Sequence, residues 1–250
     1  MAQNLWTREE LILAFNLYCK IPFGKIDKNT SHVIELAKLI ERTPSAVSWK
    51  LVNFASLDPQ LQARGIKGAA NRSKKDEEIW NEFFENWDDL AFESEKLLAR
   101  YQDQKLETSD ELKIKDGKER ERKVKTRVNQ NFFRAMMLTS YNGRCCITNL
   151  QNPDLLIAAH IIPWAKDKTN RLNPKNGLLL NALHDKAYEH GHIAIDEEYK
   201  IHVSKDILES ENEGYKRFFA PYHLQTIQEP ERFLPDRECL REQLTERFRG

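Results

Sequence analysis

The 250 residues are 40% hydrophobic and 10% aromatic, which is enough to build the cores of two modest domains, and no apolar run approaches the roughly 20 residues that span a bilayer. The 39 basic and 39 acidic residues leave no formal net charge, which argues against a uniform basic coat for a polyanion but not against local basic patches. The first residues lack the apolar stretch of a signal peptide, and no Cys-x-x-Cys pair occurs, so we expect a soluble cytoplasmic protein with neither a disulfide framework nor a four-cysteine zinc site.

The first third of the chain predicts three short helices. Thr7 can cap the first helix, and an apolar stripe follows it at helical spacing, formed by Leu11, Phe15 and Tyr18. A second helix fits residues 32–40. The clearest start signal belongs to the third helix, where Thr43 is a capping residue and Pro44 occupies the first helical position.

Three helices with a short turn before the last describe a helix-turn-helix arrangement. The outward side of the third helix offers Ser45, Ser48 and Lys50, and Arg42 stands just before it, so these residues are candidates for contacts with a DNA groove or its phosphates. The segments WTREE and ERTPSAVSWK resemble the Myb/SANT-like helix-turn-helix family over residues 5–55, which implies DNA binding. A three-helix core with a solvated polar face, or a domain that binds protein, is the alternative.

A further amphipathic helical stretch over residues 76–101 completes a helical domain that we place at 1–101. Residues 102–125 carry few apolar side chains and many charges of both signs, which is typical of a linker or an exposed helix. We therefore place the domain boundary there and expect a second domain over residues 126–250.

The second half predicts a strand, a loop, a second strand and a helix in that order. The run LLIAAHII is short, continuous and apolar, which favours a buried strand closed by Pro163. A polar loop leads to the apolar run GLLLNAL, and the helix-compatible LHDKAYEHG follows, ended by Gly191. A second strand pair is expected over residues 192–204.

Three side chains in this order suit the hydrolysis of a phosphodiester. That reaction requires a base to activate water and a cation against the scissile phosphate. His160 on the first strand can be the base at neutral pH, His184 on the helix can hold the metal, and Asn176 can pin the loop between them. Each residue alone is commonplace as a core histidine, a turn asparagine or a helix-surface histidine, so only their joint spacing points to a nuclease.

The segments AAHIIPW and NPKNGLLLNALHDKAYEHGHIAID resemble the HNH endonucleases of the bacterial restriction-endonuclease type, and the resemblance extends over residues 126–250. It implies an α+β fold, with the helical helix-turn-helix-like domain followed by a ββα-metal nuclease domain. It also implies hydrolysis of double-stranded DNA, in restriction or defence, with a divalent cation. We favour Mg²⁺ over Mn²⁺ because oxygen-rich sites suit it.

The resemblance also implies roles for individual residues. His160 matches the general base, Asn176 the residue that supports the loop, and His184 the first metal ligand. Asp185 and Glu189 complete the predicted ligand set. Two basic residues of the loop are predicted to contact phosphate, namely Arg171 and Lys175.

The chain departs from the family pattern at two positions. Ala159 stands where many HNH enzymes carry a ligand just before the base, and Gln243 stands where relatives often have a histidine. These departures motivate an alternative hypothesis, a DNA-binding or regulatory protein whose HNH fold has lost its activity. A homodimer would suit cleavage of both strands, but the sequence indicates no interface.

Overall fold

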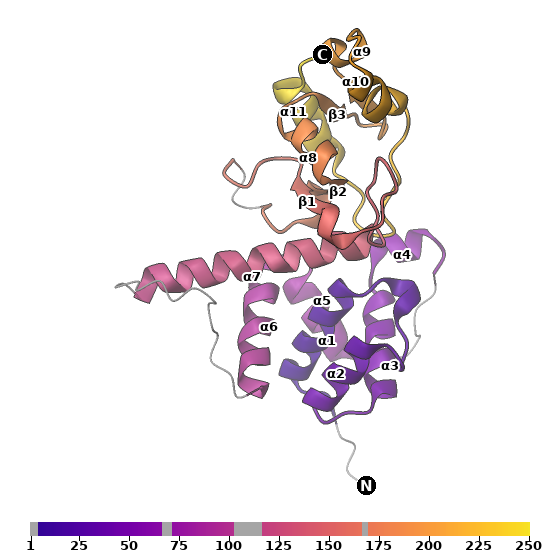
Figure 1. Ribbon diagram of the computed structural model, residues 1–250. Coiled ribbons are helices and arrows are strands. Elements are labelled where there is room, and N and C mark those ends of the chain that lie inside the picture. Colours follow the sequence, from indigo (N-terminus) through magenta and orange to yellow (C-terminus); the bar gives the residue numbers. More distant parts are fainter. Residues whose placement is uncertain (1–4, 67–71, 103–116, 167–169) are drawn as a thin grey trace. The chain divides into compact units, whose positions relative to one another are not determined.

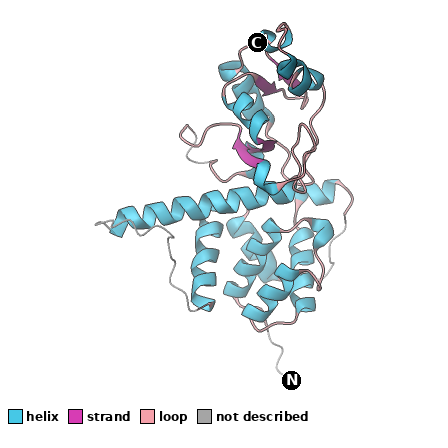
Figure 2. Ribbon diagram, viewed as in Figure 1, coloured by secondary structure: helices cyan, strands magenta, loops and turns pink. Residues whose placement is uncertain are grey.

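The computed structural model describes residues 5–66, 72–102, 117–166 and 170–250, with side chains from residue 125 onward in the third range (Figure 1). The chain divides into two compact units, Met1–Met136 and Met137–Gly250. The described part of the first unit is helical, whereas the second combines helices with short strands (Figure 2). Among the described residues, no helix combines the length and the apolar character that crossing a bilayer requires.

Helices α1 (Arg8–Lys20) and α3 (Pro44–Ala55) begin at the capping residues that the sequence predicts. Thr7 accepts a hydrogen bond from the backbone N–H of Glu10, whose carboxylate accepts one from the backbone of Thr7. Thr43 accepts from the backbone N–H of Ala46 and is followed by Pro44. The helices are α1 (Arg8–Lys20), α2 (Ser31–Leu39), α3 (Pro44–Ala55), α4 (Pro59–Ala63), α5 (Lys74–Phe83) and α6 (Trp87–Tyr101), with a 3₁₀ turn at Phe23–Lys25.

An aromatic cluster forms the core of the first unit. The Phe15 ring lies 5.0 Å from that of Phe54 and 5.2 Å from that of Trp80, which joins α1 to α3 and α5. The predicted helical stretch over 76–101 is two helices, because the chain turns between α5 and α6 at Glu85, where φ is 70°.

The division between the units falls inside one helix, α7 (Gly117–Ser140). This helix covers the end of the charged segment 102–125 and continues into the second unit. Residues 103–116 of the expected linker lie outside the described residues. The unit boundary at Met136–Met137 is therefore later in the chain than the boundary expected at residue 126.

The second unit contains the predicted strand, loop, strand and helix. Strand β1 (Leu156–His160) pairs antiparallel with β2 (Gly177–Asn181), which places His160 opposite Gly177. Helix α8 (Ala182–Glu189) follows β2 without a loop and packs on both strands. Asn181 begins this helix, since its side-chain oxygen accepts from the backbone N–H of His184.

The remaining elements follow α8. Strands β3 (Ile193–Ile195) and β4 (Ile201–Val203) form the predicted second pair. In the turn between them, the Asp196 carboxylate accepts hydrogen bonds from the backbone N–H groups of Glu198 and Lys200. Helix α11 (Arg237–Arg247) packs on β3. The helices are α9 (Lys205–Leu208), α10 (Glu213–Phe218) and α11 (Arg237–Arg247), with 3₁₀ turns at Pro153–Leu155, Pro174–Asn176 and Ala220–Tyr222.

Candidate active site

A pocket of about 270 Å³ lies in the second unit between β1 and α8. One wall is the end of β1, another is the face of α8 that carries two carboxylates, and α11 contributes one side chain. The lining residues are Ile157, Ala158, Ala159, His160, Pro163, Asp185, Tyr188, Glu189 and Arg247. The pocket therefore joins the predicted base to two of the three predicted metal ligands.

His160 is half-buried at the end of β1, and its ring has one defined tautomer. Nε2 lies 2.9 Å from the carbonyl oxygen of Arg171. Because a carbonyl oxygen only accepts, Nε2 carries the hydrogen and Nδ1 carries the lone pair. Burial lowers the pKa of His160 below its ordinary value, although the hydrogen bond to Arg171 opposes that shift. The imidazole is therefore neutral near pH 7, the form that can accept a proton.

Asn176 connects the two ends of the loop between β1 and β2, and its side chain is buried. Its Oδ1 accepts from the backbone N–H of Ile162 at 2.7 Å, and its Nδ2 donates to the carbonyl oxygen of the same residue at 3.2 Å. Its own carbonyl oxygen accepts from Ile161. These bonds hold the backbone directly after His160, so Asn176 positions the base through the main chain.

Asp185 and Glu189 lie one turn apart on α8, on the face that lines the pocket. Burial and the nearby charge of Glu189 raise the pKa of Asp185. A hydrogen bond from Lys186, at 2.5 Å, lowers the pKa of Glu189. Two like charges in one pocket are stabilised by a cation between them, since an opposite charge favours both ionised forms.

The residues of this pocket fit a hydrated Mg²⁺ ion. Among the described residues, no three or more His, Cys, Asp or Glu side chains are grouped to hold a metal. Mg²⁺ does not need such a cage, because it keeps several waters and binds through one or two carboxylates together with phosphate oxygens. Asp185 and Glu189 supply that number of carboxylates. Ala159 lines the pocket but has no ligating atom.

His184, predicted as the first metal ligand, is not among the residues that line the pocket, so the structure does not bring it together with Asp185 and Glu189. The residue is 2% exposed, with Nδ1 3.0 Å from Oδ1 of Asn181 and Nε2 3.0 Å from the carbonyl oxygen of Phe218. Both ring nitrogens therefore contact protein oxygens. The reason is helical geometry, since one residue along α8 turns a side chain by about 100° away from the direction of Asp185.

The two basic loop residues lie outside the lining of the pocket. Nε of Arg171 donates to the carbonyl oxygen of Trp164 at 3.0 Å, and the guanidinium lies over the Trp164 ring. Lys175 belongs to the 3₁₀ turn that ends at Asn176, and its carbonyl oxygen accepts from Asp236. The main-chain oxygen of Arg171 thus orients His160, whereas the phosphate contacts of both side chains stay predictions.

Two residues that were predicted to contact DNA, Arg42 and Lys50, are ion-paired within the first unit. Arg42 forms a two-pronged pair with the Glu10 carboxylate, with both distances 2.9 Å, and Lys50 lies 2.7 Å from Asp76. The Arg42 and Lys50 side chains are each only 8% exposed, and both lie against the Trp6 ring. Both cations are therefore paired inside the unit. Arg42 connects the segment before α3 to α1, and Lys50 connects α3 to α5.

The uncharged candidates of α3 remain accessible. Ser45 is exposed and Ser48 is half-buried. Trp49 beside them is 62% exposed. Their contacts with DNA stay predictions. The two nearby cations that would attract phosphate, Arg42 and Lys50, are paired with carboxylates inside the unit.

Sequence reasoning missed Arg247, which lines the pocket from α11. It lies within the closing run CLREQLTERFRG, where several charged residues occur at helical spacing. Nothing in that local pattern separates the residue that faces the pocket from its exposed neighbours. Gln243, one turn earlier, is buried, and its amide has no hydrogen-bond partner among the described residues.

The comparisons with known proteins agree with this geometry. Residues 145–196 match a family model described as HNH endonuclease. The matched segment contains β1, β2, α8 and β3, and therefore His160, Asn176 and both carboxylates, but it ends before α11. A search of curated proteins found no match to the chain. The HNH part of the predicted resemblance is confirmed, and it indicates a nuclease domain that acts on DNA.

Proposed function

We propose that this protein is a metal-dependent endonuclease that hydrolyses phosphodiester bonds of double-stranded DNA, with His160 as the general base. The observation that carries the proposal is the pocket that His160, oriented by its Nε2 contact with the Arg171 carbonyl, lines together with two carboxylates. Arg247 from α11 also lines the pocket. The match to HNH endonucleases over residues 145–196 supports the same reaction class.

In this mechanism His160 removes a proton from a water molecule in the pocket. The water oxygen forms a bond to phosphorus, and the bond from phosphorus to the departing sugar oxygen breaks. The Arg171 carbonyl keeps the imidazole oriented, since it holds the Nε2 hydrogen, and Asn176 keeps the backbone after His160 in place. A divalent ion held by Asp185 and Glu189 would stabilise the charge that develops on the phosphate oxygens.

The charges of the pocket support a requirement for metal. Among its lining residues, Asp185 and Glu189 are acidic and Arg247 is basic, so the pocket alone is net negative at neutral pH. A DNA phosphate carries a negative charge and would be repelled by that excess. One divalent cation reverses the sign of the pocket and makes phosphate binding favourable.

Plasmid DNA tests the proposed activity directly. Incubation of the purified chain with supercoiled plasmid and Mg²⁺ or Mn²⁺ is expected to give nicked or linear product, and a chelator is expected to stop the reaction. Absence of cleavage with either metal, together with retained DNA binding, would favour the alternative of an inactive HNH fold. The role in restriction or defence rests on the resemblance of the motifs, and a homodimer stays a prediction.

The first unit is proposed to hold duplex DNA through the exposed part of α3, at Ser45 and Ser48. Arg42 and Lys50 are not assigned to this surface, because both are ion-paired within the unit. A mobility shift of the full chain with Ser45→Glu and Ser48→Glu, measured as salt rises, tests this contact. Unchanged affinity in both variants would favour protein binding by this unit.

Loss of the two carboxylates is expected to weaken metal binding. Asp185→Asn and Glu189→Gln remove one charged ligand each and keep the shape of the side chain. We expect each to weaken Mn²⁺ or Mg²⁺ binding by at least about tenfold, or ~1.4 kcal/mol, in titration calorimetry. Glu197→Gln is the matched control, since Glu197 pairs with Arg241 and does not line the pocket. Equal affinity in the pocket variants and the control would exclude these carboxylates as ligands.

The pH profile of cleavage should report the state of His160. Only the neutral ring can take a proton from water, and burial lowers the pKa of His160 from 6.5. Activity is therefore expected to persist through neutral pH and to fall with a midpoint below 6.5, as the ring becomes protonated. The measurement is kcat/KM from pH 5 to 8 at saturating metal. A flat profile over this range would contradict His160 as the base.

A further inference from the structure

Helix α11 lies beyond the segment that matches the nuclease family, yet it reaches the pocket. Asp236 caps the start of the helix, since its side chain accepts from the backbone N–H groups of Glu238 and Cys239, and the helix ends at Arg247. It packs on β3, which follows α8 directly. A part of the chain distant from the matched motif therefore completes the site.

The end of α11 is docked against the turn after α8. A guanidinium nitrogen of Arg247 donates to the carbonyl oxygen of Glu189, and the backbone N–H of Arg249 donates to the carbonyl oxygen of Gly191 at 2.9 Å. Gly191 has φ of 76°, and a Cβ there would lie 1.9 Å from the main-chain oxygen of Arg247. Only glycine allows this approach, so the turn fixes where Arg247 enters the pocket.

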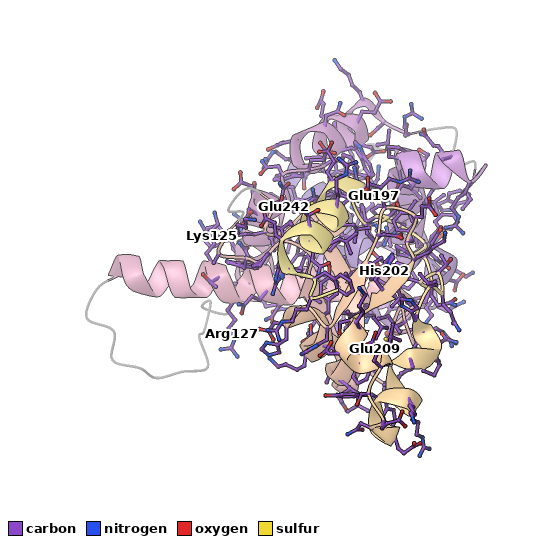
Figure 3. The ribbon with its side chains drawn as sticks, turned by 90° about the horizontal axis from the view of Figure 1, so that it is seen from above. Lys125, Arg127, Glu197, His202, Glu209 and Glu242 are labelled. Atoms are coloured by element: carbon purple, nitrogen blue, oxygen red, sulfur yellow. The ribbon has the colours of Figure 1, made fainter. Side chains whose placement is uncertain are left out.

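A second connection joins α11 to the loop after β1. Lys166 pairs with Glu242, at 2.5 Å, and with Glu246, both on the same helix. Glu242 is labelled in Figure 3, as is Glu197, the partner of Arg241. These pairs are exposed and each contributes little stability. They show that α11 contacts both the loop after β1 and the end of α8, which are the segments next to the two walls of the pocket.

Arg247 is the basic residue among those that line the pocket. Its guanidinium is permanently charged and presents five N–H donors in a planar fork, which matches the oxygens of a phosphate. Among the described residues, its side chain makes one hydrogen bond, to Glu189. Donors therefore remain for a ligand in the pocket. If Arg247 only held the end of α8, its side chain would not need to line the pocket.

We propose that Arg247 binds the non-bridging oxygens of the scissile phosphate, opposite the water that His160 activates. This inference rests on the proposed function and adds a substrate-binding residue that the matched motif does not contain. A charged donor already in place stabilises the extra negative charge of the transition state more than that of bound DNA. Arg247 is therefore expected to act mainly on kcat.

The test compares Arg247→Gln, Arg247→Lys and Arg249→Gln in the full chain. Arg249 is exposed and contacts Gly191 through its backbone, so Arg249→Gln controls for loss of a nearby positive charge. We expect Arg247→Gln to lower kcat for plasmid cleavage by roughly 10²–10³-fold. Arg247→Lys keeps the positive charge but not the planar guanidinium, so kcat should fall less, by about tenfold. Arg249→Gln should have the kcat of the wild type.

A binding measurement separates phosphate contact from a structural role. In a His160→Ala background with Mg²⁺, Arg247→Gln is expected to weaken the binding of a short duplex several-fold, with unchanged thermal unfolding. Wild-type cleavage by Arg247→Gln, or a loss of activity matched by lower thermal stability without any change in duplex affinity, would overturn the proposal. If the unmodified protein fails to cleave, the proposed function fails, and the duplex affinities still test the phosphate contact.

Discussion

Replacing His160 by alanine is expected to lower the rate of DNA cleavage by roughly 10²–10⁴-fold, which is the usual contribution of a general base. The side chain lines the pocket, and its Nδ1 carries the lone pair because Nε2 is held by the Arg171 carbonyl. Removal of the ring leaves the carboxylates of α8 and Arg247 in place. Duplex binding should therefore persist. Single-turnover cleavage at saturating enzyme and metal measures the change.

Two further histidine variants make this result specific. His190→Ala removes an exposed imidazole at the end of α8 and should leave cleavage unchanged. His184→Ala removes a buried ring that contacts Asn181 and Phe218, so it should reduce thermal stability. A stable His184→Ala variant that no longer binds metal would restore the metal-ligand role predicted from the sequence. Full activity of His160→Ala would exclude the proposed mechanism.

Removing the charge of Lys50 is expected to destabilise the first unit by about 3–5 kcal/mol, because it leaves a buried carboxylate without its cation. Asp76 is 0% exposed and receives Lys50 Nζ at 2.7 and 3.0 Å. Asn53 and the backbone of Ser73 also donate to Asp76, so part of its charge stays compensated. Urea unfolding of Lys50→Ala, followed by helical circular dichroism, measures the loss.

The same variant separates stability from DNA binding. Arg72→Ala, which breaks the exposed pair with Glu77, is the control and should cost no more than about 1 kcal/mol. The double variant Lys50→Met with Asp76→Leu removes both charges and should recover most of the stability. Full stability of Lys50→Ala together with weaker DNA binding would show that Lys50 faces DNA after all.

Under the proposed function, the carboxylates of α8 would serve as metal ligands in the absence of a ligand at position 159. Ala159 occupies the strand position before the base and contributes no oxygen or nitrogen from its side chain. The carboxylates come instead from successive turns of α8, which packs across the same strand. Asp185 and Glu189, which both belong to the matched segment, are proposed to replace the ligand that is missing at position 159.

Local sequence signals were sufficient for much of the fold. Capping residues and apolar spacing predicted the starts of α1 and α3 and the order of β1, β2 and α8, because these features depend on residues within a few positions of one another. His160 and Asn176 were found for the same reason, since a strand end and a loop end are set locally. The sequence therefore determined two of the segments that form the pocket, β1 and α8, but not α11.

Tertiary structure alone decided which side chains enter the pocket and which charges are available. Arg42 and Lys50 looked like surface cations, but their partners, Glu10 and Asp76, lie on other helices and are distant in the sequence. His184 and Asp185 are neighbours, and the orientation of α8 on the strands places only Asp185 in the pocket. Arg247 joins the site across the docked end of α11. Such pairings depend on how elements pack, which no local pattern of residues encodes.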